Sequence, residues 1–334
     1  MYYLHTQRNL KLATALMIVA LSILMARNTS WSAVENYPTK PIQVIISYAP
    51  GDTDANLRPF IDKMPEFLGQ PMFFVYKPGG SGAVGASFVA KANPDGYTII
   101  GTSPGPVLMT PFVIEGIDYT LDDFVPICRL AISPNLLVVR TDSPLKTLND
   151  LVLEAKKSPG KLTYGTSGTF GSAHTPMLIF SKLAGIELTH VPCKGCSPAV
   201  TALLGGHVDM TSCTMAPIAP HIRSGALRAL GLHTSKRSRV FPDIPTFSEL
   251  GYPVVFNVWF GLMAPKGVPK EVVEKIFDAS KKVVEQRKEF IEERMKLLGI
   301  ELAFLDAKEW LNEIKAQGDM FREVIKDAKE KGKK

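Results

Sequence analysis

Long apolar runs are scarce in this sequence, and the one run that could be considered for a membrane lies at the start of the chain. It covers residues 12–26, follows Arg8 and Lys11, and leads into a polar stretch that ends at Ala33. A basic start, a short apolar core and small residues after it are typical of a cleaved secretory signal. We therefore predict a signal peptide over residues 1–33, with a retained N-terminal anchor as the alternative, and an exported, soluble protein.

Net charge is also low once that segment is removed. The chain has 38 Lys and Arg against 32 Asp and Glu, a formal charge of +6, and the segment contributes three basic residues and no acid, which leaves +3. The lysine-rich end over residues 329–334 has no aromatic residues among its lysines, as a nucleic-acid surface would need. We predict no nucleic-acid partner.

Cysteine is rare, with four in 334 residues, and only Cys193 and Cys196 are closely spaced. A thioredoxin-like role is disfavoured, because we do not expect the pair to open a helix directly after a strand and because Pro192 precedes it. A zinc site is disfavoured because no second closely spaced ligand pair exists. A disulfide within the pair, a disulfide from one of them to Cys213, and free thiols all stay open. We predict no metal and no cofactor.

Short β-rich runs alternate with segments of helical spacing along the rest of the chain. This alternation predicts an α/β protein with parallel sheets and helices on both of their faces. Thr147, with Asp150 in the first turn, predicts a helix that begins at Leu148 and stops before Pro159. The runs expected to form strands cover residues 42–48, 72–76, 98–101, 136–139, 162–164, 188–191 and 227–232.

Two glycine-rich turns lie between an expected strand and an expected helix. The first covers residues 48–54 and leads into segment 55–68, and the second covers residues 164–172 and leads into segment 173–183. Neither is a nucleotide loop, because the chain has no Gly-Lys-Ser/Thr triplet and the second turn lacks dinucleotide spacing. A glycine-rich turn lets a ligand approach the backbone closely, and the unpaired amides of a first helical turn attract an anion. The turns therefore predict an anion site, with ordinary tight turns as the alternative.

Several longer segments together resemble a known family, the extracytoplasmic solute receptors of tripartite tricarboxylate transporters, also called the Bug or TctC family. The resemblance runs from about residue 37 to residue 329, in the family's order and spacing. Its segments are YPTKPIQVIISYAPG, KPGGSGAVGASFVAKANPDGYTIIGTS, SPGKLTYGTSGTFGSAH, HVPCKGCSPAVTALLGGHVDM, IRSGALRALGLHTSKRSRVFPDIPTFSELG and WFGLMAPKGVP.

This resemblance implies a two-domain α/β periplasmic binding protein of type II, with the ligand in the interdomain cleft. Residues 34–133 and 252–334 would form the first domain, and residues 134–251 the second. Closure of the domains over the ligand would be the mechanism. The implied function is a monomeric, non-enzymatic receptor that captures a small carboxylate, whether a dicarboxylate, a tricarboxylate or an aromatic acid, and delivers it to the membrane permease subunits of the transporter.

The same resemblance implies the site residues, which hold the ligand through backbone amides, hydroxyls and ordered waters. They belong to the two glycine-rich turns, to a third segment after residue 101, and to two positions beside the cleft. The implied ligand-binding residues are Tyr48, Ala49, Pro50, Gly51, Thr53, Asp54, Thr102, Ser103, Ser167, Gly168, Thr169, Gly171, Ser172, His174, Cys193 and Asp209. For His174 a structural role stays open, and for Asp209 a role in capping a neighbouring loop.

The chain also departs from the family pattern. Its first turn is one residue shorter than usual and places Asp52 where glycine is common, so this acid must turn to solvent or meet a cation on the ligand if binding is not to suffer. Cys193, Cys196 and Cys213 replace other residues near the expected cleft, a change that could enlarge the pocket for a longer or aromatic acid. Two alternatives to the receptor are an exported enzyme with a cysteine nucleophile and a ligand sensor for a membrane signalling protein. No nucleophile with a partnered base is evident, which disfavours the enzyme.

Overall fold

The computed structural model describes residue 17 and residues 36–331, with side chains described up to residue 323. By its contacts the chain divides into residues 1–39 and residues 40–334, and the fold below is that of the second unit. The expected signal peptide over residues 1–33 lies outside the described residues, apart from residue 17. None of the helices in the described ranges combines the length and apolar character that a membrane crossing requires.

The first sheet has six strands in the order β11-β4-β10-β3-β1-β2. β1 (Ile42–Ile46), β2 (Met72–Tyr76) and β3 (Thr98–Thr102) run parallel. β1 reads IQVII and is almost wholly buried, as expected for a parallel strand covered on both faces. β4 (Phe124–Ser133), β10 (Val258–Pro265) and β11 (Glu301–Asp306) pair antiparallel on the other side.

The second sheet has five strands in the order β7-β6-β8-β5-β9. β6 (Thr163–Thr166) runs parallel to both β7 (Thr189–Pro192) and β8 (Met210–Thr214). β5 (Asn135–Arg140) is antiparallel to β8 and to β9 (Leu227–Leu232). Both sheets are therefore mixed, which corrects the expectation of purely parallel sheets.

The chain passes between the two sheets twice. β4 ends at Ser133 and β5 begins at Asn135, so a single residue separates a strand of the first sheet from a strand of the second. The return path lies between the end of β9 and the start of β10. We keep the division into residues 34–133 with 252–334, and 134–251, as a proposal that this strand membership supports.

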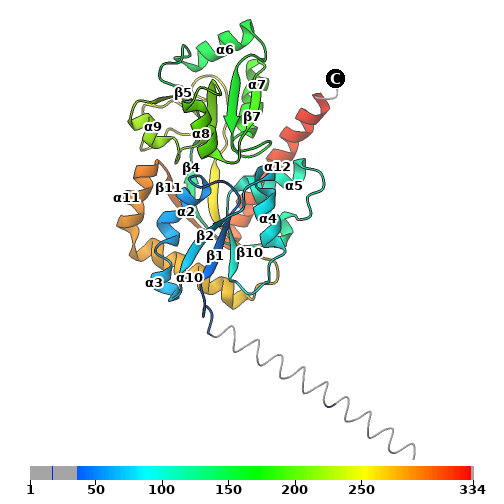
Figure 1. Ribbon diagram of the computed structural model, residues 1–334, viewed down its shortest axis with the longest axis vertical. Helices are drawn as coiled ribbons and strands as arrows, with labels where there is room; N and C mark the ends of the chain where they lie inside the picture. The colour runs from blue at the N-terminus through cyan, green and yellow to red at the C-terminus, as the bar shows by residue number, and fades with distance from the viewer. Residues whose placement is uncertain (1–16, 18–35, 332–334) are drawn as a thin grey trace, which may run out of the picture. The chain divides into compact units, whose positions relative to one another are not determined.

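Helices cover both sheets (Figure 1). α6, α7, α8 and α9 surround the second sheet, and α2, α3, α4, α10 and α11 surround the first. Thr147 caps α6 as predicted: its hydroxyl accepts the Asp150 N–H at 3.1 Å. The helices are α2 (Thr53–Ile61), α3 (Pro65–Leu68), η1 (Gly80–Gly82), α4 (Ala83–Ala90), η2 (Gly105–Met109), α5 (Thr110–Val113), η3 (Leu121–Asp123), α6 (Leu148–Lys157), α7 (Thr175–Ala184), α8 (Cys196–Leu204), α9 (Ala219–Arg223), α10 (Lys270–Gln286), α11 (Lys288–Leu298) and α12 (Ala307–Lys331).

Each sheet has its own aromatic packing. Next to the first sheet, Trp310 of α12 is fully buried and meets Trp259 of β10 edge to face, with ring centroids 5.0 Å apart. Behind the second sheet, Phe180 of α7 meets Phe247 and Tyr252 in the same manner, each at 5.0 Å. Aromatic pairs of this geometry add stability beyond the area they bury. These packed layers fix the strand ends from which the functional loops start.

Candidate ligand-binding site

Four strand-to-helix loops meet at one cavity of about 180 Å³. Two follow β1 and β2 of the first sheet, and two follow β6 and β7 of the second. Because the carboxyl ends of parallel strands lie at the same edge of a sheet, each sheet contributes a pair of adjacent loops. The cavity is lined by Tyr48, Gly79, Gly80, Ser81, Gly82, Ser167, Gly168, Pro192, Cys193 and Lys194.

The loop after β2 has an unusual backbone. Gly79, Gly80, Ser81 and Gly82 have φ angles of +138°, +56°, +54° and +94°, and Ser81 adopts this conformation despite its side chain. The hydroxyls of Tyr48 and Thr110 both donate to the Ser81 carbonyl, at 3.2 and 3.0 Å, and hold the loop in place. Strained backbone of this kind is concentrated at functional sites, and successive turned amides form concave anion-binding surfaces.

The loop after β6 approaches the Gly79–Gly82 loop very closely. Gly168 has a φ of +146°, and a Cβ atom at this position would lie 2.8 Å from Ser81 Oγ and 3.1 Å from Ser81 Cβ. Its carbonyl accepts the Thr166 hydroxyl at 2.9 Å, which fixes the turn. Glycine is therefore required at residue 168 because the two sheets meet there without room for a side chain.

His174 stabilises the second turn through a hydrogen bond to its backbone. Its Nδ1 accepts the N–H of Phe170 at 2.8 Å, and its ring stacks on His190 with centroids 3.8 Å apart. Burial, with His190 next to it, lowers the pKa of His174 to about 3, and burial lowers the pKa of His190 to about 4. Both rings are thus neutral near pH 7. His174 does not line the cavity, and the geometry supports the structural role that the sequence left open.

Asp54 organises the first turn. Its Oδ1 accepts the N–H groups of Gly51 and Asp52 at 2.8 and 3.1 Å, while its Oδ2 accepts the Tyr76 hydroxyl at 2.9 Å and contacts Arg58 at 3.3 Å. The carboxylate is buried and faces its own loop. Asp54 therefore shapes the backbone of the turn and is not on the cavity wall.

The side chain of Asp52 adopts neither of the two arrangements expected from the sequence, which were exposure to solvent and contact with a cation on the ligand. Its side chain is buried, and its carboxylate accepts the N–H of Cys196, at the start of α8, at 3.1 Å and the hydroxyl of Thr214 at 3.3 Å. Its pKa is raised from 3.8 to about 6, mainly by burial and also by the nearby Asp54, although its hydrogen bonds to Cys196 and Thr214 act in the opposite direction. An acid of the first sheet thus caps a helix of the second.

All four cysteines are free thiols. Cys193 lines the cavity, whereas Cys196 and Cys213 are buried, and burial raises the pKa of each of these three thiols. Contrary to expectation, the Cys193–Cys196 pair does lie between a strand and the first residue of a helix. The raised pKa values nevertheless keep the thiols protonated, so none is an activated nucleophile. Within the described ranges, no group of three or more His, Cys, Asp or Glu residues could hold a metal ion.

Four of the residues expected from the sequence line the cavity: Tyr48, Ser167, Gly168 and Cys193. Most of the others lie in the surrounding loops, where Ala49 donates its N–H to the Lys194 carbonyl at 2.9 Å and ties the sheets together. The expected residues that do not line the cavity but stand in or next to these loops are Ala49, Pro50, Gly51, Thr53, Asp54, Thr102, Ser103, Thr169, Gly171, Ser172 and His174.

The position of Asp209 differs from the one expected, which was beside the ligand. Its carboxylate accepts the N–H and the hydroxyl of Thr163, both at 2.8 Å. Thr163 begins β6 and Asp209 precedes β8, so this contact lies at the opposite end of the parallel strands from the 167–172 loop. Asp209 is a strand-end cap, which was the alternative that the sequence left open.

The sequence reasoning missed the Gly79–Gly82 loop, Pro192 and Lys194. A signal for the first existed, because Gly79-Gly80-Ser81-Gly82 is a third glycine-rich turn between a strand and a helix. It follows β2, the parallel neighbour of β1, so its position beside the first turn could have been inferred. Among the described residues that line this cavity, Lys194 alone has a charged side chain.

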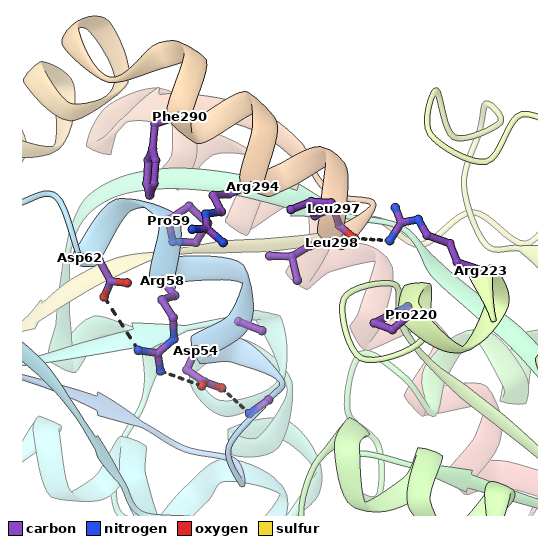
Figure 2. Close-up of a pocket in the computed structure, with 12 residues that line it drawn as sticks. Asp54, Arg58, Pro59, Asp62, Pro220, Arg223, Phe290, Arg294, Leu297 and Leu298 are labelled. Atoms are coloured by element: carbon purple, nitrogen blue, oxygen red, sulfur yellow. Dashed lines mark hydrogen bonds and ion pairs between the residues drawn. The ribbon is translucent and has the colours of Figure 1, made fainter. Parts of the chain in front are cut away.

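A second, larger cavity of about 710 Å³ lies on another side of the first turn (Figure 2). α2, α9 and α11 enclose it, and Gly51 and Asp54 form part of its wall. Arg58 reaches both Asp54 and Asp62, and Arg223 donates to the carbonyls of Leu297 and Lys296 at the end of α11. The smaller cavity is the one lined by loops with positive φ angles and by the close approach of Gly168 to Ser81. We therefore take the smaller cavity as the candidate site.

Comparison with known proteins places these features in a family. Residues 57–329 match the family described as "Tripartite tricarboxylate transporter family receptor". A protein of Cupriavidus necator, "UPF0065 protein in gbd 5'region", is 37% identical over 262 residues, which cover 78% of this chain and 80% of that protein. "Protein BugT" of Bordetella pertussis is 34% identical over 262 residues, with 77% and 80% covered.

Solved structures show the same fold. The periplasmic binding protein BugD is 30% identical, with a TM-score of 0.82 over 87% of this chain and 98% of that one. A protein of R. palustris solved with adipate is 28% identical, with a TM-score of 0.82 and 87% and 97% covered. MatC from Rhodopseudomonas palustris, with bound malate, is 28% identical, with a TM-score of 0.77 and 87% and 98% covered.

Proposed function

The chain belongs to the family of tripartite tricarboxylate transporter receptors, also called the Bug or TctC family, and from this premise we propose that it captures a small carboxylate in the periplasm and delivers it to a membrane permease. Proteins of this family are solute-binding receptors and not enzymes. The protonated thiols around the cavity are in keeping with a receptor that leaves its ligand unchanged.

The observation that carries the proposal is the meeting of the Gly79–Gly82 loop and the 167–172 loop across the cavity. Between them they contribute turned backbone and the side chains of Ser81 and Ser167, and the neighbouring loop contributes Lys194, an exposed lysine on the cavity wall. A charge-assisted hydrogen bond contributes roughly 1.5 to 3 kcal/mol. Three or four such donors on one carboxylate would supply much of the roughly 8 kcal/mol of micromolar binding.

The volume of the cavity limits the size of the ligand. A volume of about 180 Å³ is below the roughly 300 Å³ at which pockets for drug-sized ligands begin. The cysteines at residues 193, 196 and 213 do not enlarge this cavity as expected, because Cys196 and Cys213 are buried in the core of the second sheet and only Cys193 lines the cavity. The volume favours a small acid, of the size of the adipate and malate in the solved relatives, over a bulkier tricarboxylate such as citrate.

Thermal unfolding of the purified protein with a panel of aliphatic mono- and dicarboxylates, citrate and aromatic acids tests this function. We expect at least one small aliphatic acid to raise the melting temperature, because a ligand at 100 times its Kd stabilises the folded state by about 2.7 kcal/mol. Mass spectrometry should recover that acid unchanged. Conversion of the acid, or a panel without any binder, would contradict the proposal.

A further inference from the structure

Asp52 fills the anion position at the start of α8 from within the chain. Its carboxylate accepts the Cys196 N–H, the first amide of the helix, and the Thr214 hydroxyl. The rest of the first turn has few donors left: Pro198 has no N–H, and the N–H of Ala199 already bonds to the Gly195 carbonyl at 3.3 Å. Asp52 therefore occupies the position at which an anion commonly binds a helix N-terminus, and in the first turn it leaves a ligand only the N–H of Ser197.

The buried charge of Asp52 has no cation as a partner within the described part of the chain. Its two side-chain contacts are neutral donors, and the charged group nearest along the chain is the like-charged Asp54, which is engaged with Arg58 and Tyr76. Tyr48, Cys196 and Cys213 complete its ionisable surroundings, and each is neutral near pH 7. Asp52 lies near the cavity without lining it: it binds the N–H of Cys196, three residues after the cavity-lining Cys193, and its charge helps to raise the pKa of Tyr48, which also lines the cavity.

The charges near the cavity limit the number of carboxylates that a ligand can have. The cavity wall, as far as the described residues form it, has one charged side chain, Lys194, and Asp52 places one negative charge behind that wall. A ligand with one carboxylate can use Lys194 and the loop donors. A second carboxylate in the same small volume would approach Asp52 without a second cation, and like charges brought together in a desolvated site are strongly unfavourable.

We propose that Asp52 makes this receptor select acids with a single carboxylate, and with a neutral or cationic remainder, over dicarboxylates. The proposal rests on the proposed function and names the substrate class of the same site. In this respect the receptor differs from its relatives solved with adipate and malate. The selecting residue stands outside the cavity wall and acts through its charge and through its hold on α8.

Isothermal titration calorimetry at pH 7.5 with matched acids tests the selection. The pairs are butanoate with succinate and hexanoate with adipate, and 4-aminobutanoate represents a cationic remainder. We expect the monocarboxylate of the preferred pair to bind at least about tenfold more tightly than its dicarboxylate. Asp52→Asn should reduce that ratio by about tenfold, because it removes the charge, keeps one acceptor oxygen for the Cys196 N–H, and can donate from its NH2 group to the Thr214 hydroxyl oxygen.

Asp62→Asn is the matched control, because it removes one negative charge from the same helix region at a side chain that is 53% exposed. The ratio should not change in this variant. If Asp52→Asn does not fold, Asp52→Ser takes its place. If neither variant folds, the relative affinities of the unmodified protein for monocarboxylates and dicarboxylates decide.

Two failures are distinguishable. If no acid of either kind binds to the unmodified protein, the proposed function itself is wrong. If dicarboxylates bind as tightly as their monocarboxylate partners, or if the ratio is the same in Asp52→Asn as in the unmodified protein, the receptor function stands and the role of Asp52 is overturned.

Discussion

At the scale of single residues, the site depends on side chains that hold loops more than on side chains that line the cavity. Asp54 and His174 each accept backbone N–H groups of the turns that they stabilise. The sequence could identify these residue types near the turns. It could not tell a residue that faces the ligand from one that faces the loop, because the direction of a side chain in a turn depends on φ angles such as those of Ser81 and Phe170.

Asp52 makes the stability of the folded protein depend on pH. Its pKa is raised from 3.8 to about 6 in the folded state, so the folded protein holds a proton that the unfolded chain has released. The resulting stabilisation is fully present below pH 3.8 and is lost as the pH rises through 6. The pKa difference corresponds to about 3 kcal/mol.

The substitution Asp52→Asn should therefore have a more favourable effect on the stability of the folded protein at high pH than at low pH. We expect the free energy of unfolding of the variant, relative to that of the unmodified protein, to rise by up to about 3 kcal/mol between pH 4 and pH 7.5. Urea denaturation at the two pH values measures it. The buried histidines, whose lowered pKa values act in the opposite direction, cancel in the comparison. A difference that does not vary with pH would mean that Asp52 is not a buried, proton-binding acid.

At the scale of elements, seven of the strands and the capped helix α6 could be predicted, whereas β4, β8, β10 and β11 could not. Strands such as Ile42–Ile46 and Leu227–Leu232 show as short β-rich runs. β8 reads MTSCT, which has no apolar pattern although all five residues are buried, and β11 is an edge strand with an irregular register. Their place in the fold is set by pairing with distant strands, and local sequence does not encode that pairing.

The contact between the two loops of the site makes Gly168 the most sensitive position in these elements. In Gly168→Val the new Cβ would meet Ser81 at 2.8 to 3.1 Å, at a φ of +146° that valine rarely adopts. We expect acid binding to weaken by at least about tenfold, because each 1.4 kcal/mol of misfit is a tenfold loss and overpacking costs roughly 1 to 3 kcal/mol.

Gly185→Val is the control for that variant. Gly185 also has a positive φ, +63°, and a Cβ added there, at the far end of α7, would have no described atom within 4 Å. Both variants should lose stability through backbone strain, measured by thermal unfolding, and only Gly168→Val should lose ligand-induced stabilisation. Equal binding by the two variants would exclude residue 168 from the site.

At the scale of the whole molecule, the unit of residues 40–334 is held together across its two sheets by the same loops that form the site. The Ala49 N–H bonds to the Lys194 carbonyl, Asp52 caps α8, and Gly51 lies so close to Ser197 that a Cβ would be 2.6 Å from its hydroxyl oxygen. Ligand binding and the arrangement of the sheets are thus linked through one short turn. The family resemblance predicted this two-domain architecture, but the sequence did not foresee that an acid would join the domains.

The choice between the two cavities is the central claim. The smaller one offers backbone amides, hydroxyls and one lysine, whereas the larger one offers arginines, among them Arg223 and Arg294, beside exposed apolar side chains (Figure 2). Both border the first turn, so loss of binding after a change in that turn would not separate them.

A crystal structure of the protein with its tightest-binding acid is the most direct test. We predict the carboxylate between the Gly79–Gly82 loop and residues 167–168, within hydrogen-bonding distance of donors from both domains. An acid found in the larger cavity and held by its arginines would contradict the claim.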